Sequence, residues 1–125
     1  GEKRGWLMVQ YYPKMRIIDI CIADTGITIL GSYQKFGFSN IKDDYTALKK
    51  ALSGLSTKNL KERGRGLYST NNVVTLSLNG FFTIVSGNAL FFERKYYSIP
   101  VEWPGTLVSM RIRTDIQNLN LYNYI

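Results

Sequence analysis

The order of strand-like and helical segments predicts an α+β domain, a two-layer α/β sandwich with helices on one face of a mixed, mostly antiparallel sheet. This fold class is supported by the order of the elements, by their grouping into runs and by the chain length. Two β-rich apolar runs open the chain, two helical segments follow, and three further strand-like runs close it. Strands that gather in runs, rather than alternating with helices, favour antiparallel pairing. The 125 residues are enough for a single domain with its own core.

The first two strands are predicted at residues 6–12 and 16–23. The first run is rich in β-forming residues, and Pro13 marks a turn after it. The second run is almost continuously apolar, which is typical of a central strand. The two runs together predict a hairpin.

Two helices are predicted after this hairpin. Residues 30–40 are interrupted by Gly, Ser and Asn and are interpreted as a loop. The first helix is expected to begin near Asp43, a favourable N-cap, and to end near Gly54, a stop signal. A second helix is expected from Leu67 to about Leu78. The first helix has apolar residues at spacings of 4, 3, 4 and 3, namely Ile41, Tyr45, Leu48, Leu52 and Leu55.

The last part of the chain is again strand-like. Residues 81–85 and 89–93 flank Ser86-Gly87-Asn88, which predicts a hairpin. Residues 94–105 contain two prolines and are expected to form a loop, whereas residues 106–113 alternate as a last strand does.

Composition narrows the chemistry that is available. Sixteen Lys and Arg against nine Asp and Glu give a net charge of +7, which permits an anionic partner without choosing one. The absence of histidine excludes a His-based triad or metal site, and the single Cys21 excludes an internal disulfide and a cysteine-based zinc site. With no apolar run of membrane-spanning length and no signal peptide, we expect a cytoplasmic protein without a membrane segment.

The stretch Asp24-Thr25-Gly26-Ile27-Thr28 is the first candidate site. A carboxylate at the end of a buried strand can accept a hydrogen bond from a ligand amino group in a partly dry pocket. Gly26 would let a flat ligand approach the backbone. The alternative is an ordinary turn at a strand end, because Asp and Gly both favour turns.

The stretch Gly64-Arg65-Gly66-Leu67 is the second candidate, at the start of the second helix. Backbone amides at a helix N-terminus bind phosphate, and glycine allows close approach. The alternative is a basic, glycine-punctuated loop. The stretch is neither a Walker loop nor a Rossmann fingerprint, since it lacks the Gly-Lys-Ser/Thr ending and the preceding strand.

Taken in order, these segments resemble the histidine-kinase-like ATPase superfamily, also called GHKL. Residues 24–29 resemble its first glycine box, Asp-x-Gly-x-Gly-Ile. Residues 56–58 and 63–67 resemble its ATP lid and second glycine box, and residues 104–112 its closing Pro-Gly-Thr strand. The resemblance covers residues 6–113.

The resemblance implies a Bergerat-type ATP-binding fold that lacks its N-terminal helices, with ATP and Mg²⁺ as cofactors. Asp24 would accept the adenine amino group and Gly26 would let the base pack closely. Glycines at the start of the second helix would meet the phosphates. No residue is assigned as catalytic or as a metal ligand. The nucleotide-binding residues that the resemblance implies are Asp24, Gly26, Thr28, Thr57, Gly64, Arg65, Gly66 and Leu67.

Three departures from the family pattern matter. Thr28 stands where the second glycine is usual, and Tyr68 stands where a glycine would follow Gly66-Leu67. The Asn-bearing helix that supplies the magnesium ligand should precede the first strand, and only residues 1–5 do so. We therefore expect no hydrolysis by this chain alone. We also expect an exposed apolar sheet that pairs with a protein partner or with a second copy.

These expectations define a leading function and two alternatives. The leading function is the nucleotide-binding region of a signalling ATPase or sensor-kinase-like protein. The first alternative is a non-catalytic interaction module of the same fold, and the second is a basic nucleic-acid-binding domain. The latter is disfavoured because the aromatic residues fall in apolar strand-like runs. Residues 1–125 are expected to be one domain or domain fragment, with a core over 6–113 and a polar tail over 114–125.

Overall fold

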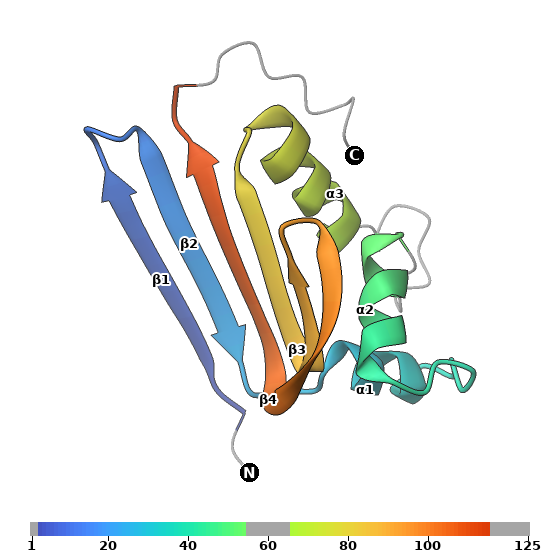
Figure 1. Ribbon diagram of the computed structural model, residues 1–125. Coiled ribbons are helices and arrows are strands. Elements are labelled where there is room, and N and C mark those ends of the chain that lie inside the picture. Colours follow the sequence, from blue (N-terminus) through green and yellow to red (C-terminus); the bar gives the residue numbers. More distant parts are fainter. Residues whose placement is uncertain (1–2, 55–65, 116–125) are drawn as a thin grey trace.

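The computed structural model describes residues 3–54 and 66–115. Within these ranges the sheet and its helices form two layers (Figure 1). The elements in chain order are β1 (Gly5–Tyr12), β2 (Ile17–Asp24), α1 (Ile29–Lys35), α2 (Asp44–Leu52), α3 (Gly66–Asn72), a π-helix η1 (Val73–Ser77), β3 (Phe81–Phe92) and β4 (Lys95–Arg113).

The sheet has four strands in the order β1-β2-β4-β3, and every neighbouring pair is antiparallel. The α+β class and the helices on one face are as the sequence predicts. The prediction of a mixed sheet is corrected to an antiparallel one, and the predicted fifth strand is part of a longer strand. The helices lie over β3 and β4, whereas β1 and β2 extend beyond them (Figure 1).

The first hairpin is confirmed. β1 and β2 pair one to one from Gly5 with Asp24 to Tyr12 with Ile17. The turn between them is closed by the Arg16 amide, which donates to the Pro13 carbonyl at 3.2 Å.

The prediction of a loop over residues 30–40 is wrong, because α1 lies at Ile29–Lys35. Thr28 caps this helix through its Oγ1, which accepts a hydrogen bond from the Gly31 amide at 3.0 Å. Tyr33 is buried in a cluster with Ile41 of the following loop and two alanines of α2. The cap and this burial stabilise the short helix despite its weak intrinsic propensity.

The two predicted helices are present. Asp43 caps α2, since its Oδ1 accepts from the Thr46 amide, and Gly54 follows the helix with a φ of 100°. The second predicted helix is split, because α3 widens into the π-helix η1 at Val73. The Leu78 amide then donates five residues back, to the Val73 carbonyl at 2.9 Å.

The predicted hairpin at residues 86–88 and the predicted loop at 94–105 are both wrong. β3 runs on through Gly87 with shifts in register, and the chain reverses instead at Glu93-Arg94, which have φ values of 49° and 64°. Gly87 has a φ of 58°, and a Cβ there would overlap the Asp44 carboxylate. Glycine therefore lets β3 bend against the start of α2, where the Asn88 amide donates to Asp44 Oδ2 at 3.1 Å.

The core lies between α2, η1 and the helix-facing side of β3 and β4. Val108, Met110 and Ile112 of β4 pack against it and are partly buried. No helix within residues 3–54 and 66–115 is long and apolar enough to cross a membrane. The buried residues of this cluster are Leu48, Leu52, Val74, Phe82, Ile84, Ala89 and Phe91.

Candidate nucleotide-binding site

Asp24 is the last residue of β2, and its two carboxylate oxygens have different surroundings. Oδ1 accepts hydrogen bonds from the backbone amides of Gly26 at 3.0 Å and Thr106 at 3.2 Å. Oδ2 accepts no hydrogen bond from the described part of the chain. It is also not fully buried, since the unpartnered buried atom of that part is Oδ1 of Asn71. The fold thus fixes the carboxylate through one oxygen and leaves the other available to a ligand.

The neighbouring strand β4 holds Asp24 in place from the other side. Gly105 lies so close that a Cβ there would overlap the Asp24 carbonyl oxygen and lie 2.6 Å from Oδ1. The indole Nε1 of Trp103 donates to the same Asp24 carbonyl at 2.9 Å. Both the backbone and the side chain of Asp24 are therefore positioned by residues 103–106 of β4.

A buried serine links this corner to the start of α1. Ser86 is 1% exposed, and its Oγ accepts from the Ile29 amide at 2.9 Å. The same Oγ lies 3.3 Å from the Gly105 carbonyl, to which it donates, and 3.2 Å from Thr106 Oγ1. Hydrogen bonds thereby connect the end of β2, the bend in β3 and the middle of β4.

Sequence reasoning missed Ser86 and Thr106 as members of this corner. Both lay in stretches that it had singled out, the Ser-Gly-Asn stretch and the Pro-Gly-Thr strand. The available signal was a small polar residue beside a glycine at two strand positions. Its meaning depends on tertiary contacts, because Thr106 meets Asp24 while Ser86 bonds to Ile29 and Gly105.

Gly26 and Thr28 have defined local roles. The Gly26 amide binds Asp24 Oδ1, and a Cβ on Gly26 would meet that oxygen at 3.4 Å, at the limit of ordinary van der Waals contact. The observed structure therefore needs the Gly26 amide as a hydrogen-bond donor but does not require a glycine at this position. Thr28 uses its hydroxyl oxygen to cap α1.

The second candidate stretch is described only in part, because Thr57, Gly64 and Arg65 lie outside the described residues. Gly66 is the exposed first residue of α3, and a Cβ on it would have no atom of the described residues within 4 Å. Leu67 packs against both buried clusters, and so does Ile29 at the start of α1. The segments that follow the two glycine motifs therefore rest on the same core.

Burial raises the pKa of Tyr33 to about 12, so its phenol stays neutral within its cluster. No three carboxylate or thiol side chains from residues 3–54 and 66–115 are placed so that they could hold a metal ion together.

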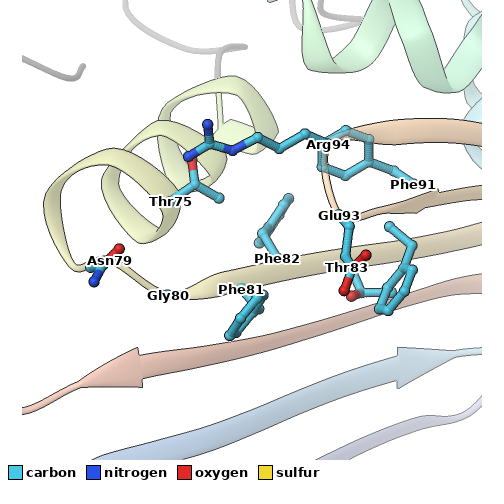
Figure 2. A pocket seen from close by; sticks show the side chains of 10 residues that line it. Thr75, Asn79, Gly80, Phe81, Phe82, Thr83, Phe91, Glu93 and Arg94 are labelled. Carbon is cyan, nitrogen blue, oxygen red and sulfur yellow. The ribbon is translucent and has the colours of Figure 1, made fainter.

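A separate pocket of about 330 Å³ lies under the tip of the β3–β4 hairpin. Phe81, Phe82 and Phe91 supply much of its wall, and Arg94 extends across it towards Thr75 of η1 (Figure 2). Of the sequence-predicted site residues that the structure describes, none lines this pocket. Its apolar wall beside a cation differs in character from the Asp24 corner.

No protein-family model, curated protein or solved structure matches the chain.

Proposed function

We propose that the chain is the nucleotide-binding region of a cytoplasmic signalling ATPase of the GHKL type, and that Asp24 recognises adenine. The single observation that carries the proposal is the asymmetric use of the Asp24 carboxylate. Two backbone amides hold Oδ1, while Oδ2 has no partner in the described chain. A fixed, half-satisfied carboxylate at a strand end is suited to binding a ligand amino group.

Base selectivity follows from this chemistry. Adenine carries an exocyclic amino group that donates to a carboxylate oxygen. Guanine presents a carbonyl oxygen at the equivalent ring position, and its lone pairs would face the Asp24 charge without a shared proton. A site built to accept a hydrogen bond discriminates strongly against a ligand that cannot donate one.

The phosphates would lie towards residues 64–67, where the resemblance puts backbone amides and Arg65. A Cβ on Gly66, the first residue of α3, would have no atom of the described residues within 4 Å, which leaves room for a phosphate oxygen on that side. We propose that Mg²⁺ arrives bound to the nucleotide phosphates, which it would neutralise. In this proposal the chain alone binds ATP without turning it over.

A second candidate function is a non-catalytic interaction module of the same fold. Two observations favour it. Thr28, which stands where the family pattern has its second glycine, uses its hydroxyl to cap α1. Strand β1 presents apolar side chains that no described element covers. The two functions differ in the ligand, which is a nucleotide in the first and a protein in the second.

A titration followed by the amide resonances of the labelled chain tests the proposal. We expect ATP with Mg²⁺ to shift the Gly26 and Thr106 amides, because both donate to Oδ1 of the carboxylate whose Oδ2 would bind the base. GTP at the same millimolar concentrations should leave them nearly unchanged. Equal responses to ATP and GTP, or no response at this corner, would contradict adenine recognition there.

A further inference from the structure

Strand β1 is an edge strand without the features that usually protect an edge. Within residues 3–54 and 66–115 it pairs with β2 alone and lies at the end of the sheet. Between Trp6 and Tyr12 it contains no charged residue and no proline, and its pairing with β2 has no bulge. Natural sheets usually protect an exposed edge with such devices, because an unprotected edge pairs with other chains.

The side chains of β1 are also exposed on both faces of the sheet. Leu7 and Val9 are 69% and 57% exposed on the face that carries the helices, and Met8 is 66% exposed on the other face. The helix layer ends over β4 and does not reach this strand (Figure 1). A further strand beside β1 would remove apolar surface from water on both sides at once.

The hydrogen bonds of the first hairpin show which backbone groups are free. The Thr25 amide donates to the Arg4 carbonyl at 2.9 Å, so residue 4 belongs to a hydrogen-bonded pair. Such pairs alternate along an antiparallel ladder. Even-numbered residues of β1 therefore bond to β2, and the amides and carbonyls of Gly5, Leu7, Val9 and Tyr11 point outward.

We infer that this edge binds β1 of a second copy of the chain, antiparallel and about a two-fold axis. Outward-facing residues must oppose one another, and the register with Leu7 opposite Val9 of the second copy joins the most of them. It forms four hydrogen-bonded pairs, two of Leu7 with Val9 and two of Gly5 with Tyr11. Met8 then faces Met8 of the second copy across the axis.

The adjacent registers are less favourable. A shift of two residues in one direction places Gly5 opposite Pro13, which has no amide hydrogen, and Arg4 opposite Lys14. A shift in the other direction leaves Tyr11 opposite Lys3, outside the strand. The Met8-centred register puts no like charges opposite each other, and it brings Arg4 next to Tyr12 of the second copy.

The net charge predicts how this association responds to salt. Each copy carries +7, so two copies repel at long range. The contact itself is apolar and hydrogen-bonded, so salt screens the repulsion without weakening the contact. The dimer should therefore strengthen as ionic strength rises, opposite to the response of a complex with an acidic partner.

Sedimentation velocity on the full chain, at several protein and salt concentrations, tests the inference. We expect a concentration-dependent dimer for the wild type. Met8→Lys and Met8→Glu should each weaken it about tenfold or more, because like charges would meet across the axis. An equimolar mixture of the two variants should dimerise again. Met15→Lys, at an exposed turn residue away from the edge, is the matched control and should dimerise as the wild type does.

Amide hydrogen exchange supplies a readout that is specific for this edge. Raising the protein concentration should slow exchange at Leu7, Val9 and Tyr11. It should change Met8 and Gln10 little, since their amides already bond to β2. A wild type that stays monomeric throughout would overturn the inference. So would Met8 variants that dimerise normally, or slowed exchange without the odd–even pattern.

Discussion

The two halves of the sheet share one apolar pattern but differ in burial. Phe82 and Ile84 of β3 are 3% and 0% exposed, whereas Leu7 and Val9 of β1 remain mostly in water on the same face. The difference lies in the second layer, because α2 and η1 cover β3 and nothing described covers β1. Alternation along a strand therefore defines a face, and only the second layer decides whether that face stabilises the fold.

The largest expected effect separates the two halves directly. Ile84→Ala should lower the free energy of unfolding by about 2–5 kcal/mol, because it leaves a cavity in the packed core. Val9→Ala should change it by no more than about 0.5 kcal/mol in a monomeric sample, because Val9 is exposed. Urea denaturation of both variants measures the difference. Similar losses would show that the β1–β2 half is covered in solution.

The next effect concerns close packing at the Asp24 corner. Gly105→Ala should destabilise the fold by about 1–3 kcal/mol, because the new methyl group would overlap the Asp24 backbone. Gly26→Ala is the matched control, and about 0.5 kcal/mol or less is expected, since its Cβ has room. Thermal unfolding of the pair tests the geometry, and a larger loss from Gly26→Ala would contradict it.

An effect of similar size is expected from the hydrogen bonds of Ser86. Ser86→Ala leaves the partly buried Ile29 amide without its acceptor and should cost about 1–3 kcal/mol. Ser98→Ala, at an exposed position of β4, is the control and should be nearly neutral. Chemical denaturation checks this prediction, and equal stabilities of the two variants would remove Ser86 from the account.

Much of the fold could be predicted because its signals are local. The apolar runs give β1 and β2, and the Asp43 cap with apolar residues at helical spacing gives α2. The position of Asp24 at a strand end was predicted for the same reason. These features need no knowledge of what lies across the sheet.

The features that could not be predicted depend on tertiary contacts. α1 is stabilised by the burial of Tyr33, which its glycine and serine do not indicate. β3 passes through Gly87, which packs against Asp44 of α2. The glycine that predicted a hairpin turn therefore forms a bend within a longer strand. The partnership of Asp24 with Thr106 joins residues far apart in sequence, and no local pattern encodes it.

The smallest expected effect lies on the sheet face away from the helices. Arg111 donates two hydrogen bonds to Asp19, at 2.7 and 2.8 Å, and these lower the pKa of the Asp19 carboxyl. The stabilisation is therefore complete above the unfolded-state pKa of about 3.9 and is lost as the pH falls through the lower folded-state pKa. The effect should be slight, because the pair is exposed.

Asp19→Asn isolates this contribution. The variant should lose less stability than the wild type as the pH is lowered below about 4, since it has no carboxylate to protonate at that position. Denaturant titrations across the acid range measure the two slopes. Identical slopes would show that the ion pair contributes nothing in solution.

The most direct test of the account is the affinity of Asp24→Asn for ATP. Asparagine keeps Oδ1 as the acceptor for the Gly26 and Thr106 amides and replaces the free Oδ2 with a donor, so the fold should persist. Calorimetric titration should show binding weakened by about 1.5–3 kcal/mol, or roughly 10- to 150-fold, while Asp19→Asn binds as the wild type does. Unchanged affinity in a folded Asp24→Asn protein would contradict adenine recognition by this residue.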